Sequence, residues 1–385
     1  MKIKNPEKIK EILERGVERV IDKESLFKKL SSGKPLRIKH GIDPTGPNIH
    51  IGRAIQLWKL RAFQEMGHKA VLIIGDFTAQ IGDASDKQAI RKPLSLKEIK
   101  ENMKNYKKQI GKIVDMKKAE VHYNSKWFNK MKLKEIISLS MSFTAQQMIQ
   151  RRNFKERWDS SKPIGLHEMY YPILQGYDSF AIKADVEIGG YDQLFNLTTG
   201  RKVQELLGQA PQDIMVSKML NGLDGRKMST SWGNVITIVD SPKEMYGKVM
   251  SMKDELIPEY FELCTDIAIS SKEPRKAKAM LARKIVSLYH GEEKAIIEER
   301  EFEKVFVRKE CPSDIPEVEI KDKRLSVLNL VFETGLTNSK GEAKRLITQG
   351  AVEINGIVEK DWKKEITPQR GAIIQVGKRR FAKIA

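Results

Sequence analysis

The chain is poor in cysteine and contains no long apolar run. Its two cysteines, Cys264 and Cys311, lie far apart, and neither has the paired C-x-x-C spacing of a zinc or redox site. No stretch approaches the roughly 20 consecutive apolar residues that a membrane span needs. The first thirty residues are charged throughout, which predicts an amphipathic helix rather than a signal peptide. We therefore expect a soluble, cytoplasmic protein with reduced thiols, no membrane contact and no structural metal.

Acidic residues are too few to balance the basic ones. The 385 residues include 70 Lys+Arg and 51 Asp+Glu, which gives a formal net charge of +19. An excess of this size suggests a polyanionic partner such as nucleic acid. The alternative is a lysine-rich surface that serves only solubility. With 40% hydrophobic residues the chain can bury a core, and its length predicts two or three domains.

Short apolar segments alternate with helical patterns in the first part of the chain. Strands are predicted at residues 36–42, 70–74, 185–188 and 214–217. The first strand runs into a turn rich in proline and glycine, and a helix is expected to begin near His50. Strand, helix and strand in this order form a βαβ unit, and apolar strands suit a buried parallel sheet. Residues 1–235 are therefore predicted to form a doubly wound, Rossmann-like α/β domain.

The rest of the chain divides by composition. Residues 236–310 have helical periodicity and are predicted to form an α-helical domain. Residues 311–323 contain two prolines and mixed charges, which predicts a linker. Residues 324–385 are predicted to form a small α+β domain.

The most informative segment is the turn Asp43-Pro-Thr-Gly-Pro-Asn-Ile-His-Ile-Gly-Arg53. In an open α/β sheet, ligands bind beyond the carboxyl ends of the strands. A helix that begins there offers free N–H groups and a partial positive charge, which suit a triphosphate. Gly52 would let a nucleotide approach the backbone closely. The alternative for this segment alone is a helix-capping turn with an incidental histidine.

A second polar segment, Asp224-Gly-Arg-Lys-Met-Ser-Thr-Ser-Trp-Gly-Asn234, carries two adjacent cations and three hydroxyls. Alone, such a loop is usually a solvated surface feature. The order of His50-Ile-Gly-Arg53 followed by Lys227-Met-Ser-Thr-Ser231 resembles the two signature sequences of class I aminoacyl-tRNA synthetases. These enzymes join an amino-acid carboxylate to the α-phosphate of ATP. That step needs in-line geometry and cations rather than a protein nucleophile, and a mobile loop can supply some of them.

The resemblance implies roles for individual residues. It makes Thr45, His50, Arg53 and Lys227 the catalytic contacts to the phosphates of ATP, which carries Mg2+. It also implies an ATP-binding set of Asp43, Gly52, Gly190, Asp192, Lys227, Ser229, Thr230 and Ser231. Two positions depart from the family pattern. Arg53 replaces a second histidine and can still donate to phosphate, whereas Thr230 replaces a second lysine and cannot supply its charge.

The middle of the chain narrows the choice of amino-acid substrate. Tyr171, Gln175 and Asp178 have the i, i+4, i+7 spacing of one helix face. Their segment, Tyr-Pro-Ile-Leu-Gln-Gly-Tyr-Asp, resembles the substrate helix of tyrosyl-tRNA synthetases, in which the aspartate accepts the substrate's phenol. The alternative is an ordinary helix whose polar residues face solvent.

Two further segments fit the same family. Gly-Gly-Tyr-Asp-Gln193 resembles the turn in which Asp192 and Gly190 hold the ribose and Gln193 contacts the amino acid. Residues 75–83 resemble the loop that binds the ammonium group of the substrate. The resemblance therefore implies a tyrosine-binding set of Lys39, Thr78, Asp83, Tyr171, Gln175, Asp178 and Gln193. In this set Lys39 aligns with a strand tyrosine that contacts the phenol in some members.

The last segment is basic, with 14 basic and 7 acidic residues between positions 321 and 385. Ser339 is predicted to cap a short helix that carries Lys340, Lys344 and Arg345 on one face, and Gly350 is predicted to end it. The segment resembles a small RNA-binding domain first known in a ribosomal small-subunit protein. Such helices present cations to the RNA backbone. An ordinary basic surface is the alternative.

Over its length the chain resembles the bacterial tyrosyl-tRNA synthetase family. This implies L-tyrosine, ATP with Mg2+ and tRNA(Tyr) as substrates, no tightly bound cofactor, and a homodimer whose interface lies on the catalytic domain. One alternative is the tryptophanyl branch, which shares the fold and both signatures but normally lacks the Tyr-Pro-x-Leu-Gln-x-x-Asp helix. The other is an RNA-binding protein that has lost catalysis, for which Arg53 and Thr230 are the hints.

Overall fold

The computed structural model describes residues 5–385, apart from 85–92, 309, 314, 321, 323 and 378–379. It divides into two compact units, Met1–Ala295 and Ile296–Ala385, which are described separately. Most of the predicted helical domain thus shares a unit with the predicted catalytic domain. No helix in the described part of the chain is both long and apolar enough to cross a membrane.

The first unit is built on a sheet of order β1-β6-β5-β2-β3-β4. Its strands are β1 (Val17–Ile21), β2 (Arg37–Ile42), β3 (Lys69–Ile74), β4 (Glu120–Tyr123), β5 (Val186–Gly190) and β6 (Asp213–Ser217). Strands β2 to β6 are parallel to their neighbours, and β1 pairs antiparallel with β6 at one edge. The four predicted strands and the doubly wound α/β fold are therefore confirmed.

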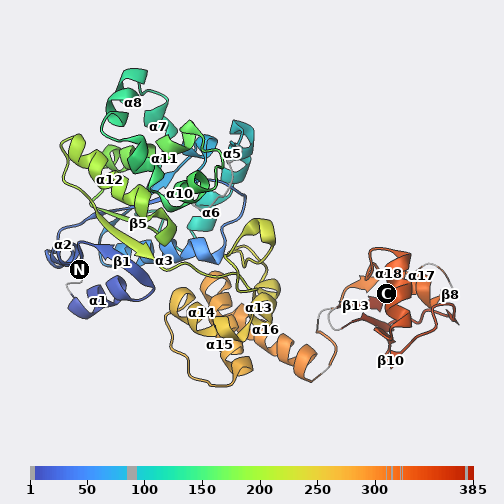
Figure 1. Cartoon of the computed structure of the whole chain (residues 1–385). Coiled ribbons are helices and arrows are strands. Elements are labelled where there is room, and N and C mark those ends of the chain that lie inside the picture. The colour runs from blue at the N-terminus through green and yellow to red at the C-terminus, as the bar shows by residue number, and fades with distance from the viewer. Residues whose placement is uncertain are drawn as a thin grey trace. The chain divides into compact units, whose positions relative to one another are not determined.

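The strand order reverses between β2 and β5. From β2 the chain runs outward through β3 and β4, and then returns to place β5 and β6 on the other side of β2. Right-handed crossovers put α3 (Ile51–Glu65) on one face of the sheet and the adjacent helices α11 (Leu166–Ala181) and α12 (Leu194–Leu206) on the other (Figure 1). At such a reversal the crevice beyond the carboxyl ends of the two strands is the usual ligand site.

The predicted single helix at the N-terminus is wrong. The structure has α1 (Pro6–Glu14), strand β1 and α2 (Lys23–Ser31) in this segment. Gly16, with a φ of 63°, ends the first helical stretch, and β1 completes the sheet edge beside β6. The charged residues there favour a helix locally, but pairing with a strand distant in sequence outweighs that preference.

The start of α11 is fixed by a buried ion pair. Arg157 of α10 (Arg152–Asp159) and Glu168 have side chains that are 1% and 0% exposed. The guanidinium donates to both carboxylate oxygens, at 3.0 and 2.8 Å, and Gly165 N donates to the same carboxylate at 2.8 Å. This bidentate geometry sets where α11 begins, and so where its later turns meet the sheet.

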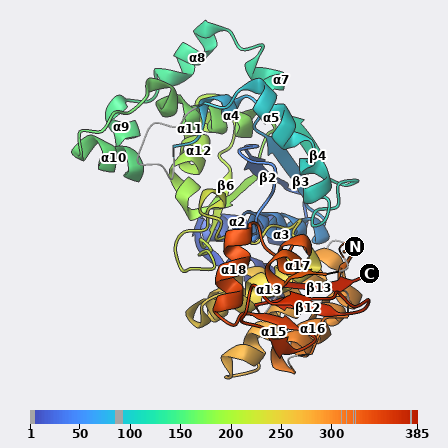
Figure 2. The same cartoon turned by 90° about the vertical axis from the view of Figure 1, so that its right-hand side faces the viewer.

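Further helices surround this sheet and follow it. They are α4 (Thr78–Ile81), α5 (Leu96–Met103), α6 (Tyr106–Ile110), α7 (Ser125–Phe128), α8 (Leu133–Ser140), α9 (Ala145–Ile149), η1 (Tyr191–Gln193), η2 (Thr230–Trp232), α13 (Pro242–Ser251), η3 (Asp254–Leu256), α14 (Ile257–Cys264), α15 (Pro274–His290), α16 (Glu292–Phe302) and η4 (Glu303–Val307). In the rotated view α8, α9 and α10 project at one end of the first unit (Figure 2). Residues 236–310, predicted to be helical, contain α13, η3, α14, α15, α16 and η4 and no described strand.

The second unit packs α17 (Val327–Glu333) and α18 (Lys340–Thr348) on a small sheet of order β10-β9-β12-β13-β7. The strands are β7 (Glu317–Val318), β9 (Val352–Ile354), β10 (Ile357–Val358), β12 (Ile373–Val376) and β13 (Arg380–Ile384), and β8 (Leu325–Ser326) pairs with β11 (Glu365–Ile366). Its predicted α+β class is confirmed. As predicted, the Ser339 hydroxyl caps α18 by accepting from Glu342 N at 3.1 Å.

The segment predicted to be a linker also contributes structure. β7 lies within residues 311–323 and pairs in parallel with β13. The linker prediction is wrong at these residues, because a strand of two residues is too short to have a periodicity that sequence could reveal.

Candidate active site

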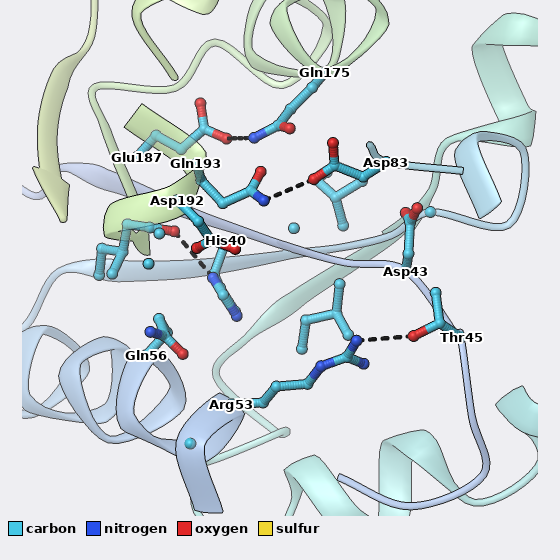
Figure 3. A pocket seen from close by; sticks show the side chains of 18 of the residues that line it. His40, Asp43, Thr45, Arg53, Gln56, Asp83, Gln175, Glu187, Asp192 and Gln193 are labelled. Carbon is cyan, nitrogen blue, oxygen red and sulfur yellow. Dashed lines mark hydrogen bonds between the residues drawn. The ribbon is translucent and has the colours of Figure 1, made fainter. Parts of the chain in front are cut away.

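A cavity of about 250 Å³ lies where the carboxyl ends of β2 and β5 meet, at the reversal of strand order. Figure 3 shows polar side chains from the turn after β2, from α3, from α11 and from the turn after β5 directed toward it. The predicted residues that line it are Asp43, Thr45, His50, Gly52, Arg53, Thr78, Asp83, Tyr171, Gln175, Asp178, Gly190, Asp192, Gln193 and Lys227. The structure therefore brings most of both predicted sets into one site.

The remaining predicted residues lie elsewhere. Lys39 lies behind the cavity wall, and Ser229 and Thr230 lie outside the lining, with Thr230 exposed. The side chain of Ser231 is outside what the structure describes. The three cations of α18 belong to the second unit.

The two signature segments are joined through their backbones. Ile51 N donates to Ile236 O and Ile238 N donates to Ile49 O, both at 2.9 Å, so the helix-starting turn pairs with the residues that follow the second loop. This pairing brings Lys227 to the same cavity as His50. The Lys227 ammonium lies 3.9 Å from Asp192 Oδ2, and both residues line the cavity.

His50 is held as a neutral imidazole. Burial, with smaller contributions from the charges of Arg53 and Lys227, lowers the pKa of His50 to about 3. Its Nδ1 atom is buried and, within the described residues, has no hydrogen-bond partner. A Cβ at Gly52 would lie 3.1 Å from this atom and 3.2 Å from Met228 Sδ, so glycine is what lets the ring sit here. At neutral pH the His50 ring is therefore uncharged.

Positive charge at this end comes from Arg53 and Lys227. Arg53 Nη2 donates to the Thr45 hydroxyl at 2.8 Å, which fixes the guanidinium beside the turn (Figure 3). Arg226, by contrast, is used inside its own loop. Its Nε donates to Asp224 Oδ2 at 2.7 Å, and its guanidinium lies 4.9 Å from the centre of the Trp232 ring.

Asn234 sets the shape of the second loop. Its amide nitrogen donates to Asp224 Oδ1 at 2.8 Å and to Lys227 O at 3.1 Å, and its oxygen accepts from Ser229 N at 2.8 Å. A Cβ at Gly222 would lie 2.2 Å from this amide, so the close approach requires glycine. The loop is therefore closed on itself around Asn234, with the Lys227 side chain left to face the cavity.

The amino-acid end is acidic and deeply buried. Asp178 is 4% exposed and accepts from Trp127 Nε1 at 2.9 Å and from Asn124 Nδ2 at 3.3 Å. Burial raises the pKa of Asp178 to about 7, although Lys39 and these two donors oppose the rise. The carboxyl group is thus positioned from behind and faces the cavity as a hydrogen-bond acceptor.

Two other aspartates organise the floor between the two ends. Asp43 accepts from the Thr78 hydroxyl at 2.8 Å and from the Tyr171 hydroxyl at 2.9 Å, and a Cβ at Gly75 would lie only 1.9 Å from its Oδ1. Asp83 accepts from Gln193 Nε2 at 2.7 Å (Figure 3) and from Arg151. Asp43 was predicted as an ATP contact, but in the structure its carboxylate holds residues of the tyrosine set.

The prediction that Lys39 contacts the phenol needs correction. Its side chain is fully buried, and its ammonium lies 2.9 Å from Glu187 Oε1, donates to Gln175 O at 2.9 Å and donates to Ser179 Oγ at 2.8 Å. These three partners stabilise the buried ammonium charge of Lys39 in its present position. Lys39 therefore supports α11 from the sheet and does not reach into the cavity.

Several functional positions were missed by the sequence reasoning. His40, Gln56 and Glu187 also line the cavity, and Asn124, Trp127 and Arg151 support its carboxylates. Burial lowers the pKa of His40, whose Nδ1 lies 3.0 Å from Ile188 O. Two signals were available in the sequence. Asn124 directly follows β4, at the ligand-binding edge of the sheet, and Gln56 interrupts the apolar side of α3 one turn after Gly52.

Comparison with known proteins assigns this architecture to a family. The model "tRNA synthetases class I (W and Y)" matches residues 31–307, and that of a "Tyrosine--tRNA ligase SYY-like C-terminal domain" matches residues 307–384. The chain is 45% identical to the Tyrosine--tRNA ligase of Moorella thermoacetica over 97% of this chain and 94% of that protein. It is 43% identical to the enzyme of the same name from Thermotoga maritima over 99% and 98%.

Solved structures show the same fold at lower identity. A tyrosyl-tRNA synthetase from Archaeoglobus fulgidus, complexed with L-tyrosine, has a TM-score of 0.62 and 20% identity, covering 76% of this chain and all of that one. A truncated mitochondrial tyrosyl-tRNA synthetase from Coccidioides posadasii has a TM-score of 0.62 and 23% identity, covering 76% and 91%. With the relatives' identity extending over nearly the whole chain, these matches lead to one conclusion: the chain belongs to the tyrosine–tRNA ligase family of class I tRNA synthetases.

Proposed function

We propose that this chain activates L-tyrosine with ATP, giving tyrosyl-adenylate and pyrophosphate, and then transfers tyrosine to the 3' end of tRNA(Tyr). The observation that carries the proposal is the shared cavity, in which the two signature segments meet at one end and the buried Asp178 faces the other. Relatives at up to 45% identity that bear the name Tyrosine--tRNA ligase support the same reaction.

In the first step the tyrosine carboxylate attacks the α-phosphate, a P–O bond forms, and the bond to pyrophosphate breaks. The nucleophile is already anionic, so no general base is needed, and the chain must supply orientation and charge stabilisation. We assign these tasks to Thr45, His50, Arg53 and Lys227, with neutral His50 as a hydrogen-bond donor. Mg2+ would arrive as part of the ATP substrate and share the phosphate charge.

The nucleotide's sugar is assigned to the turn after β5. Gly190 lies so close to Asp192 that a Cβ would be 2.7 Å from Asp192 Oδ1. A side chain at position 190 would therefore displace Asp192, whose carboxylate would accept hydrogen bonds from the ribose hydroxyls. Lys227, 3.9 Å from this carboxylate, would exchange that partner for the phosphates when ATP binds.

Tyrosine is assigned to the acidic end. Asp178 would accept a hydrogen bond from the phenol, while Tyr171, Gln175, Gln193, Thr78 and Asp83 surround the ammonium group. Phenylalanine would fill the same space but leave the buried Asp178 without this donor, and an unmade hydrogen bond to a buried charged group is costly. The site therefore favours tyrosine by its chemistry and not only by its size.

The second unit is proposed to bind the tRNA. Lys344 lies 4.2 Å from the centre of the Trp362 ring and Lys340 lies 5.7 Å from that of Phe332, so both ammonium groups are held over aromatic rings. With the exposed Arg345 they form a cationic helix face that suits RNA phosphates. Because the face recognises its partner by charge, we assign it contacts with the tRNA backbone and not with the bases.

The family resemblance also implies a homodimer and a cytoplasmic site of action, and we include both in the proposal. A row of apolar side chains runs along α8 to the residue that follows it: Leu133, Ile137 and Met141 are 72%, 48% and 80% exposed in the single chain. The spacing of i, i+4 and i+8 puts them on one side of the helix. We assign these three side chains to the interface with a second copy of the chain.

ATP–pyrophosphate exchange tests the reaction directly. We expect exchange that depends on tyrosine, and little with tryptophan or phenylalanine, because Asp178 selects a phenol. Exchange with tryptophan alone would move the chain to the tryptophanyl branch. If no amino acid supports exchange but the protein still binds RNA, the result would favour a binding protein that has lost catalysis.

Replacing Lys227 tests the second signature loop. Lys227→Ala should slow adenylate formation by about 10²–10³-fold, the usual effect of losing one preorganised donor at a developing charge. The dissociation constant for tyrosine should change less than twofold, as rapid-quench kinetics and equilibrium dialysis would measure. Lys243→Ala, an exposed cation on α13, is the matched control. A large loss of tyrosine binding would contradict the proposed role.

The pH dependence of selectivity tests Asp178. Its pKa of about 7 means that the accepting carboxylate is a minority form at pH 6 and the main form at pH 8. The ratio of kcat/KM for tyrosine over phenylalanine should therefore rise about tenfold across this range. In Asp178→Asn the ratio should be lower and independent of pH, because the titrating group is gone. An equal slope in the variant would assign the titration to another group.

The helix face of α18 is tested by charge removal. The double variant Lys344→Ala, Arg345→Ala should raise the KM for tRNA and lower the slope of log affinity against log salt by about one to two. Pyrophosphate exchange should be unchanged, because the catalytic cavity lies in the other unit. Arg370→Ala, an exposed cation of the same unit, serves as control. Equal losses of exchange and charging would show that the face is structural.

A further inference from the structure

The signature turn is held from outside by three polar side chains. Asn102 in α5, and Tyr106 and Gln109 in α6, follow each other at i, i+4 and i+7. Asn102 Nδ2 donates to Pro44 O at 2.9 Å, and the Tyr106 hydroxyl donates to Gly46 O at 2.7 Å. Gln109 Nε2 donates to Pro47 O at 2.7 Å, and its oxygen accepts from Ile49 N at 2.8 Å. We call these three residues the turn clamp.

The turn needs such support because it has few backbone hydrogen bonds of its own. Pro44 and Pro47 have no N–H to donate, and the turn bond within the segment is Thr45 N to Asp43 O at 2.9 Å. The carbonyls of such a turn need hydrogen-bond partners, and here side chains provide them. Tyr106 and Gln109 are 1% and 2% exposed, so the side chains that make these bonds are themselves buried.

The clamped atoms bracket the groups assigned to ATP. Thr45 lies between Pro44 and Gly46, and His50 follows Ile49, so three of the four clamp bonds go to a neighbour of a proposed phosphate contact. The fourth goes to Pro47 O, between Thr45 and His50 in the chain. Tyr106 also interacts with Arg53. The three clamp side chains lie behind the turn, outside the cavity lining, so they would act through its backbone.

We propose that Asn102, Tyr106 and Gln109 are positioning residues that set the backbone of residues 44–49 so that Thr45 and His50 meet the triphosphate. The inference rests on the proposed function for the site, but it concerns the ATP half alone. Tyr171, Gln175 and Asp178 belong to α11, on the other face of the sheet. Tyr106 and Gln109 bond to residues 46, 47 and 49, at least three residues from Asp43, which accepts from the Tyr171 hydroxyl. Losing a clamp bond should therefore separate ATP use from tyrosine binding.

The test uses Gln109→Met, which keeps the volume and removes two bonds, and Tyr106→Phe, which removes one. Steady-state exchange kinetics should show a higher KM for ATP and a kcat lower by about 10–100-fold in Gln109→Met, because small displacements of catalytic groups have effects of this size. Tyr106→Phe should show a smaller loss in the same direction. The dissociation constant for tyrosine, measured without ATP by equilibrium dialysis, should stay within twofold. Lys108→Gln, an exposed neighbour in α6, is the control.

Direct ATP binding, measured by dialysis in the full chain, keeps the two proposals distinguishable. A wild type that binds ATP but exchanges with no amino acid would overturn the proposed function, while weaker ATP binding in the variants would still support the clamp. Variants that bind and use ATP like the wild type would overturn the clamp. So would a parallel loss of tyrosine and ATP binding with a lower melting temperature, since that pattern belongs to general destabilisation. Tyr106→Phe decides the matter if Gln109→Met does not fold.

Discussion

The two backbone hydrogen bonds between residues 49–51 and 236–238 are the constraint on which the site depends. They join the start of α3 to the end of the second signature loop, two segments that are remote in sequence. The start of the Lys227 loop is held separately, because Asn221 is hydrogen-bonded to Glu259 and Tyr260 of α14. With the two backbone bonds the loop is tethered beside His50 at one end, and the part between Asp224 and Gly233 remains a surface excursion held in shape by Asn234. The two signature segments are thus brought together by hydrogen bonds of the main chain.

The tethered cavity is electrically divided. Arg53 and Lys227, with Asp192 beside Lys227, line the end proposed for ATP, while Asp83 and Asp178 line the end proposed for tyrosine. His50 adds a hydrogen-bonding group to the first of these ends without adding charge. Under the proposed function, the phosphates of ATP would meet the cations, and the ammonium and phenol of tyrosine would meet the carboxylates. This arrangement would favour the in-line approach of carboxylate to α-phosphate.

Much of this arrangement was predictable because its signals are local. The apolar run of β3 and the one-face spacing of Tyr171, Gln175 and Asp178 follow directly from the period of a strand or a helix. Features that depend on distant partners were not. β1 forms because β6 offers an edge, and Lys39 is buried because Glu187 and Ser179 meet it there. In both cases the deciding contact comes from a residue far along the chain, which periodicity and composition do not contain.

The buried Lys39–Glu187 pair also bears on how this pocket can change. Any redesign that enlarges the amino-acid end from the β2 side must remove a lysine whose carboxylate partner is 1% exposed, and so strand a charge in the interior. The α7 side, where Trp127 backs Asp178, has no such ion pair with that carboxylate among the contacts described. Under the proposed binding mode, room for bulkier para-substituted substrates is therefore more easily made from the helix side, because changes there leave the Lys39–Glu187 pair intact.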